Sequence, residues 1–135
     1  MTFEWLEYIK LAEQLAQNAD EASQRTAISR AYYYVYHAAN NRALANNYKR
    51  PEDGGGSHNN LWSHYERNTD PDCRRVAFLG KRLHEKRVRA DYRDTYVRIS
   101  DEMGTVLLDA KRCASMIEAL PPQYPQDPPP RIFSV

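Results

Sequence analysis

The sequence contains no apolar run of about 20 residues, so nothing in it is predicted to span a membrane. Residues 1–5 lack the basic stretch and following apolar run of a secretory signal peptide. Only two cysteines are present, Cys73 and Cys113, and neither belongs to a C-x-x-C pattern. Isolated cysteines of this kind favour buried thiols in a reducing compartment over a disulfide or a metal site. We therefore expect a cytoplasmic protein.

Glycine is scarce, and three of the five glycines stand together at residues 54–56, shortly after Pro51. A glycine-rich loop can bind phosphate, but no strand pattern precedes this one and no Gly-Lys-Ser/Thr follows it. We interpret it as a flexible helix connection. His58 and His64 are six residues apart, and no carboxylate or cysteine completes a ligand set around them. We predict neither a metal site nor a cofactor.

No segment alternates between apolar and polar residues as a half-buried strand would, whereas the three-to-four-residue spacing of helices recurs along the chain. The pattern predicts helices at residues 3–19, 21–46, 58–68, 71–91 and 101–120, with Thr2, Asp20, Ser57, Asp70 and Ser100 as N-caps. The fold class is therefore all-α, an up-and-down bundle of four to five helices over residues 1–120.

Residues 121–135 contain six of the eight prolines and are predicted to be an irregular tail. The tail includes Ile132 and Phe133, whose apolar side chains suggest docking on a partner or on the bundle itself. Simple disorder is the alternative.

Positive charge is concentrated in one stretch of a nearly neutral chain. Nine Lys or Arg and three Asp or Glu lie between residues 74 and 98, while the formal net charge of the whole chain is +1. Such a segment attracts polyanions such as RNA. The alternative is a solvated helix face on which Glu85, Asp91 and Asp94 pair with nearby arginines.

Arg87 continues the apolar stripe of Val76, Leu79 and Leu83, so it needs either a partner or an opening to solvent. Asp91, one turn further on, is the expected partner. The chain also has ten tyrosines against three phenylalanines, and four of the tyrosines lie within residues 32–36. Tyrosine suits surfaces that bind a partner while staying partly wet.

Two segments together resemble a known family. Residues 29–39, SRAYYYVYHAA, resemble the Arg-Ala-Tyr-Tyr signature on the second helix of HEPN domains. Residues 87–92, RVRADY, are similar to the Arg-x-x-Ala-Asp-Tyr signature that ends the fourth helix in one branch of small stand-alone bacterial and archaeal HEPN proteins. Ser57-His58 before Leu61-Trp62 also fits this branch. The order and spacing agree, and the resemblance covers residues 3–120.

The resemblance implies a helical bundle that forms homodimers. In active members, an Arg-x(4–6)-His motif from each subunit cuts RNA at the dimer cleft without a metal. Many members are toxins encoded beside a small nucleotidyltransferase antitoxin, which in some pairs adds AMP to a tyrosine two residues after the catalytic histidine.

This chain departs from the active motif, because no histidine follows Arg87 or Arg89 at a spacing of four to six residues. Asp94 and Tyr96 lie five and seven residues after Arg89, near the position of the missing histidine. Asp91 and Tyr92 lie four and five residues after Arg87. Aspartate can accept a proton at pH 7 but rarely holds one to donate, unlike histidine. His37 could substitute if the fold brings it close, whereas we expect His84 on a different helix face from Arg87.

The candidate catalytic residues are Arg87, Asp91 and Tyr92, and the candidate RNA- or nucleotide-binding residues are Arg30, His37, Arg89, Arg93 and Tyr96. Three functions stay open. The first is a metal-independent ribonuclease of a toxin–antitoxin or phage-defence system. The second is an inactive HEPN dimer that binds RNA, a nucleotide or a nucleotidyltransferase partner. The third is an accessory subunit of a larger defence complex, docked through its tail.

Overall fold

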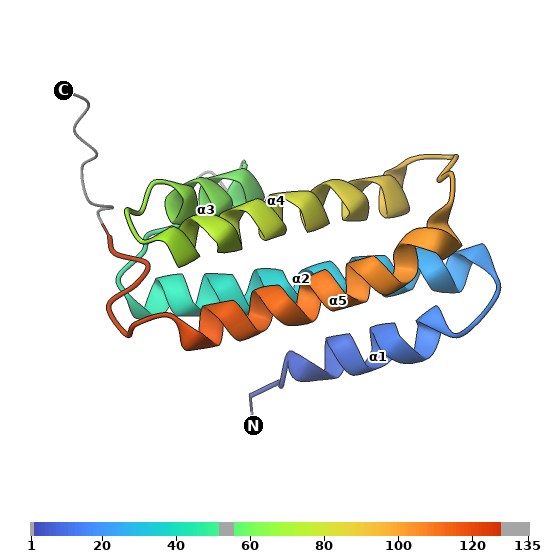
Figure 1. Ribbon diagram of the computed structural model, residues 1–135, viewed down its shortest axis with the longest axis horizontal. Helices are drawn as coiled ribbons and strands as arrows, with labels where there is room; N and C mark the ends of the chain where they lie inside the picture. Colours follow the sequence, from blue (N-terminus) through green and yellow to red (C-terminus); the bar gives the residue numbers. More distant parts are fainter. Residues whose placement is uncertain (1, 52–55, 128–135) are drawn as a thin grey trace.

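The computed structural model describes residues 2–51 and 56–127, which form an all-α bundle without strands (Figure 1). The predicted all-α helical bundle is confirmed. Its helices are α1 (Leu6–Ala16), α2 (Glu21–Ala45), α3 (Ser57–Glu66), α4 (Pro71–Tyr92) and α5 (Ile99–Ala119). Each begins and ends within about three residues of its predicted bounds, as is usual for helix ends read from sequence.

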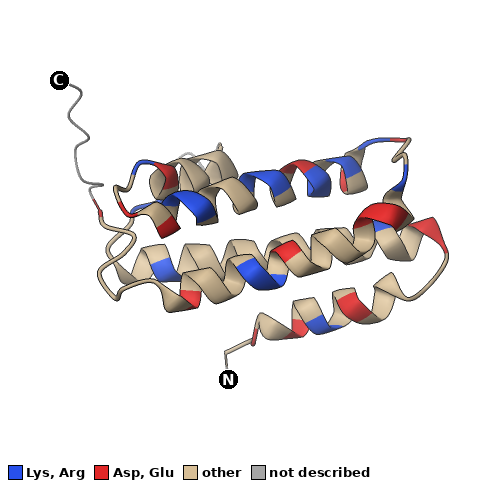
Figure 2. Cartoon of the chain, in the orientation of Figure 1, with Lys and Arg blue, Asp and Glu red and all other residues tan. Residues whose placement is uncertain are grey.

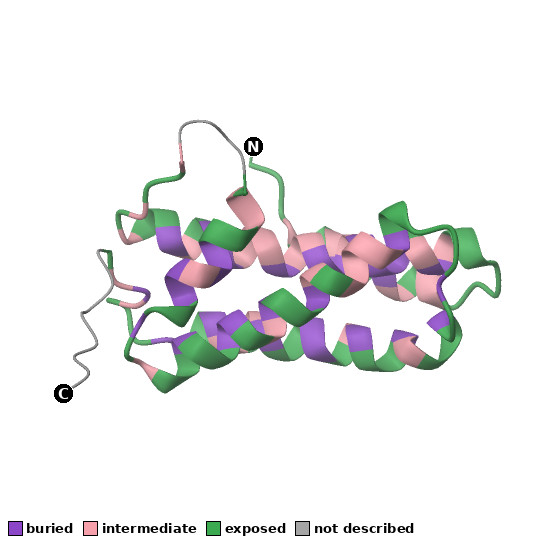
Figure 3. Ribbon diagram, turned by 90° about the horizontal axis from the view of Figure 1, so that it is seen from above, coloured by how far each residue is buried: buried purple, intermediate pink, exposed green. Residues whose placement is uncertain are grey.

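Helix α2 is the centre of the bundle because it packs against α1, α4 and α5, while α3 lies mainly against α4. Its fully buried residues include four alanines, Ala27, Ala31, Ala39 and Ala43. Small side chains let neighbouring helix axes come near one another. In Figure 3 the buried residues lie on the inward faces of the helices. The core also holds Cys73 and Cys113 as free thiols, as predicted, and burial raises the pKa of each to about 12.

Two of the predicted N-caps are confirmed. The Asp20 carboxylate accepts a hydrogen bond from the Ser23 backbone N–H at 2.9 Å. The Asp70 carboxylate accepts from Asp72 and Cys73, and Pro71 occupies the first helical turn. These carboxylates satisfy N–H groups that have no partner within the helix.

The other three predicted caps are wrong. Helix α1 follows Trp5 rather than Thr2. Helices α3 and α5 follow Gly56 and Arg98, whose φ angles are 70° and 61°, and they begin one and two residues earlier than predicted. Ser100 therefore lies inside α5, and its hydroxyl donates to Gln24 of α2 at 2.9 Å.

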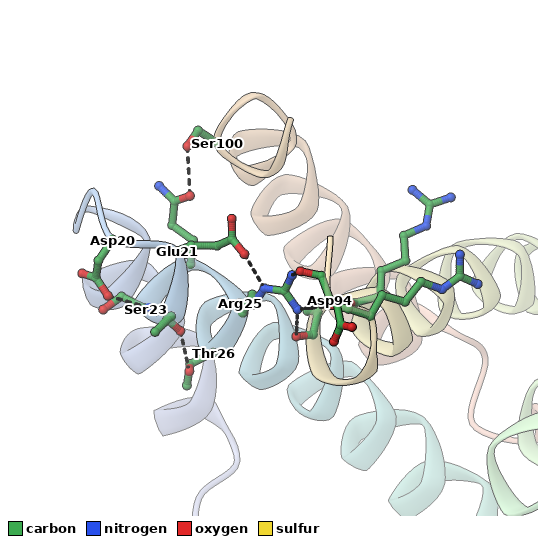
Figure 4. Close-up of polar contacts among 12 residues, drawn as sticks. Asp20, Glu21, Ser23, Arg25, Thr26, Asp94 and Ser100 are labelled. Carbon is green, nitrogen blue, oxygen red and sulfur yellow. Dashed lines mark hydrogen bonds and ion pairs between the residues drawn. The ribbon is translucent and has the colours of Figure 1, made fainter. Parts of the chain in front are cut away.

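Two arginines of α2 complete the C-terminal ends of other helices. Arg25 donates to the carbonyls of Ala90, Arg93 and Asp94 at 2.6–3.2 Å where α4 ends, and it also pairs with Glu21 (Figure 4). Arg42 acts in the same way where α5 ends, and the four carbonyls that it contacts are those of Ile117, Leu120, Pro121 and Tyr124. A guanidinium group suits these positions because the last carbonyls of a helix lack intrahelical donors and carry partial negative charge.

The described part of the proline-rich tail is irregular, as predicted, and it packs on the bundle. Pro125 is fully buried, and the Gln126 backbone N–H donates to the Asn68 side chain at 2.8 Å. Ile132 and Phe133 lie outside the described residues, and the domain boundary at residue 120 stays a prediction. Across residues 2–51 and 56–127, no helix is both long and apolar enough to cross a membrane.

Candidate functional site

One face of α2 carries Arg30, Tyr33 and His37, which are spaced three and four residues apart and therefore point the same way. Together with Tyr8 of α1 and Arg87 of α4 they line an open pocket of about 300 Å³, called the arginine pocket below. Three of the predicted site residues, Arg30, His37 and Arg87, are thus brought together by two helices, α2 and α4.

The two arginines of the pocket share one aromatic ring. The guanidinium carbons of Arg30 and Arg87 lie 5.3 Å and 5.0 Å from the centroid of the Tyr33 ring, and Arg30 also lies 4.7 Å from the Tyr8 ring. Cation–π contacts of this kind hold a guanidinium group in place without neutralising its charge. The Nε of Arg30 is buried and has no partner among the described residues. An anion in the pocket would find charged hydrogen-bond donors in the guanidinium groups of both arginines.

Arg87 is oriented by a carboxylate. Its Nε lies 2.8 Å from Asp91 Oδ2, which confirms the pairing predicted from the sequence, and the Ser29 hydroxyl lies 3.2 Å from the same oxygen. Asp91 therefore positions Arg87 and also accepts a hydrogen bond from Ser29 of α2. Tyr92 is 70 % exposed, and its ring lies 5.3 Å from the Arg87 guanidinium carbon. Tyr92 thus offers an open aromatic face at the edge of the arginine pocket.

His37 is a neutral base within the arginine pocket at pH 7. Burial, assisted by the positive charges of Arg50 and Arg30, lowers the pKa of His37. Its ring stacks on Trp5, with centroids 3.4 Å apart and an interplanar angle of 7°. A neutral imidazole held flat in this way can accept a proton or a hydrogen bond.

A buried hydrogen-bond chain next to the arginine pocket was missed by sequence reasoning. The Trp62 indole N–H donates to the Tyr32 hydroxyl at 3.1 Å, and that hydroxyl lies 2.6 Å from His58 Nδ1. Because the Tyr32 oxygen already accepts from Trp62, we infer that Tyr32 donates its own proton to Nδ1, so that His58 carries its proton on Nε2. The sequence signal was only the Ser57-His58 pair of the family resemblance.

His84 completes a histidine pair beside Arg87. Its ring lies parallel to that of His58, with centroids 4.9 Å apart and an angle of 6°. Burial lowers the pKa of His84, and Arg87 adds to this effect. The expectation that His84 and Arg87 lie on different faces was wrong, because residues three apart on a helix are neighbours.

The pKa of His58 gives a testable pH dependence. Burial, assisted by His84, Arg87 and His37, lowers this pKa to about 4, against about 6.5 in an unfolded chain. The unfolded state therefore binds more protons between these values, so the contribution of His58 to stability is complete above pH 6.5 and falls as the pH decreases toward 4. We expect an NMR titration midpoint for His58 near pH 4. A midpoint near 6.5 would contradict the buried Tyr32–His58 contact.

The other predicted residues lie apart from the arginine pocket. Arg89 pairs with Glu85 at 2.6 Å and lines a separate cavity of about 400 Å³ between α4 and α5. Arg93 is exposed where α4 ends. Tyr96 is buried beside Glu102, and burial together with that carboxylate raises its pKa.

The basic segment itself lies mainly on α4 and the turn after it (Figure 2). The alternative of a solvated, paired face holds for Glu85 and Asp91, which bind Arg89 and Arg87. Asp94 instead contributes its backbone carbonyl, which accepts a hydrogen bond from Arg25. Pairing therefore accounts for part of the charge in this segment, including that of Arg87, whereas Arg30 on α2 forms no ion pair with the described residues.

No group of three or more His, Cys, Asp or Glu within residues 2–51 and 56–127 is arranged to hold a metal ion. Comparison with known family models, curated proteins and solved structures finds no match to the chain. A function must therefore be argued from the residues of the arginine pocket.

Proposed function

We propose that the chain is a small HEPN-type protein that binds the phosphodiester backbone of RNA in the arginine pocket. The observation that carries the proposal is the convergence of Arg30 and Arg87 on one tyrosine ring, with a buried Arg30 Nε still lacking an acceptor. Guanidinium groups match the planar, bidentate geometry of phosphate. The exposed ring of Tyr92 is suited to stack against a base next to that phosphate.

The RNA proposal predicts different outcomes for two arginines on the same helix. We expect Arg87→Ala to weaken binding of a labelled single-stranded RNA by about tenfold or more, because it removes a charge-assisted phosphate contact. Arg89→Ala makes the same change in charge two residues away, outside the pocket, and should have a much smaller effect. Fluorescence anisotropy over a salt series measures both. Equal losses for the two variants would mean that RNA affinity depends on the total charge of α4 rather than on the pocket, and the pocket would be rejected.

Metal-independent RNA cleavage is the second candidate, and His37 is the observation that favours it. Cleavage by this route needs a base for the ribose 2′-hydroxyl, and His37 is a neutral histidine in the same pocket as both arginines. Asp91 instead serves to orient Arg87. The test is incubation of labelled total RNA with the protein in EDTA. Cleavage by the wild type but not by His37→Gln supports the enzyme, and binding without cleavage leaves the RNA-binding function alone.

A toxin–antitoxin or phage-defence role, a homodimer and a nucleotidyltransferase or larger effector partner belong to the same proposal through the family resemblance. Induced expression of the wild type and of Arg87→Ala tests the toxin role. Growth arrest by the wild type alone supports it, and equal growth of the two strains argues against it.

A further inference from the structure

A second concave surface lies between α4 and α5 and shares no residue with the arginine pocket. This α4–α5 groove has a volume of about 940 Å³ and contains the apolar side chains of Phe78, Leu79 and Met116. Phe78 is 63 % exposed, while Leu79 and Met116 are half-buried. Apolar side chains gathered in an open groove mark an interaction surface more often than a solvated one.

The two helices that form the groove already hold a third helix on their inner side. Helix α2 packs against both α4 and α5, and the alanines along it let the three axes approach. The same two helices also line the α4–α5 groove, which contains no residue of α2. A helix laid between two helices is the ordinary way in which a bundle grows. A helix is therefore the occupant that we infer for the α4–α5 groove.

The walls of the groove determine the charge of its occupant. Arg74, Arg75 and Arg112 line it, are exposed, and form no ion pair with any residue in the described part of the chain. Two carboxylates line it as well: Asp109 pairs with Arg82 at 3.3 Å, and Asp72 is exposed, so positive charge still exceeds negative charge among the unpaired side chains of the groove. The neighbouring Lys111 is already paired at 2.8 Å with Glu13, a carboxylate carried by helix α1. We propose that the α4–α5 groove binds an acidic amphipathic helix of a partner protein, with its apolar face on Phe78 and its carboxylates on the three arginines.

The proposal is tested on the full chain with synthetic peptides. The probe is a fluorescent amphipathic peptide of about 18 residues with leucine on one helical face and glutamate on the other. Two control peptides are compared with it. One has lysine in place of glutamate, and the other has the same residues in scrambled order. We expect the acidic peptide to bind at least about tenfold more tightly than either control peptide. Phe78→Ala and the double variant Arg75→Glu/Arg112→Glu should each weaken binding by about tenfold or more, whereas Lys10→Glu, an exposed site on α1, should not.

These variants leave the arginine pocket intact, so Phe78→Ala should not change the affinity for RNA. Loss of peptide binding and loss of RNA binding therefore test the two proposals independently. The groove proposal is overturned if the acidic peptide does not bind up to about 0.5 mM, or if Phe78→Ala leaves its affinity unchanged. Self-association that is lost in Phe78→Ala would identify a second copy as the occupant and would overturn it too. A tenfold gain in peptide affinity when Ile132 and Phe133 are replaced by alanine would also overturn the proposal. It would show that the chain's own tail competes for the groove.

Discussion

Arg42→Ala is expected to lower the free energy of unfolding by about 3 kcal/mol, because one side chain serves four backbone carbonyls. Its guanidinium donates to Ile117, Leu120, Pro121 and Tyr124 at 2.7–3.0 Å, where α5 ends and the tail begins. Water can replace the bond to the exposed Pro121 carbonyl. The part-buried carbonyls of Ile117, Leu120 and Tyr124 would lose their charged donor. Urea unfolding followed by circular dichroism measures the change, which should lower Tm by about 10 °C.

Arg112→Ala is the matched control for Arg42→Ala. Arg112 is an exposed arginine in the C-terminal half of α5, and it makes no hydrogen bond or ion pair with the described residues. We expect its replacement to change stability by less than about 0.5 kcal/mol. Arg42→Lys should be intermediate, since an ammonium group keeps the charge but cannot reach four carbonyls in one plane. A loss below about 1 kcal/mol for Arg42→Ala would show that water substitutes for the guanidinium.

Gly80→Ala is expected to destabilise the protein by about 2–3 kcal/mol, although alanine is the better helix former. Gly80 lies inside α4 against the ring of the buried Trp62. A Cβ at this position would stand 2.6 Å from Trp62 Cδ2 and nearer still to two other ring carbons. The ring cannot move away freely, because its indole N–H is bonded to the Tyr32 hydroxyl. Any shift of Trp62 would also disturb the Tyr32–His58 hydrogen bond.

Gly104→Ala is the same chemical change in another helix and should have the opposite sign. Gly104 lies inside α5, and a Cβ built on it meets no atom within 4 Å. Removing the conformational freedom of glycine from the unfolded chain should then stabilise the protein by about 1 kcal/mol. Thermal unfolding of the two variants beside the wild type tests the pair. A stabilised Gly80→Ala variant would contradict the close packing of Trp62 on α4.

The spatial grouping of the candidate residues could be predicted where they belong to one helix. Arg30 and His37 share a face of α2 because they are seven residues apart, which is close to two helical turns. The partner of Arg87 was also predictable, because Asp91 follows it by one turn. The same spacing makes His84 a neighbour of Arg87, three residues away, so the prediction that they lie on different faces was wrong. All of these relations depend only on the geometry of a single helix.

Other parts of the site could not be obtained from local spacing. Tyr8 lines the arginine pocket from α1, and Trp5, which precedes α1, stacks on His37. His58 reaches Tyr32 from α3 across 26 positions of sequence. Arg89 was an equally good candidate on charge, yet it faces a cavity between α4 and α5 because it lies two residues, or about 200°, around the helix from Arg87.

By itself the sequence determined the helical class, the approximate helix limits, two of the N-caps, the proline-rich irregular tail and the internal pairing of Arg87. These features arise from hydrophobic periodicity and from contacts within about one turn, so they do not depend on where other helices lie. Only the tertiary structure decided that Arg30 and Arg87 meet on Tyr33, that Arg25 and Arg42 complete the ends of other helices, and that Trp62 rests on Gly80. The physical reason is that periodicity shows which face of a helix is buried but not which face of another helix it meets. That choice depends on the packing of side chains that are distant in sequence.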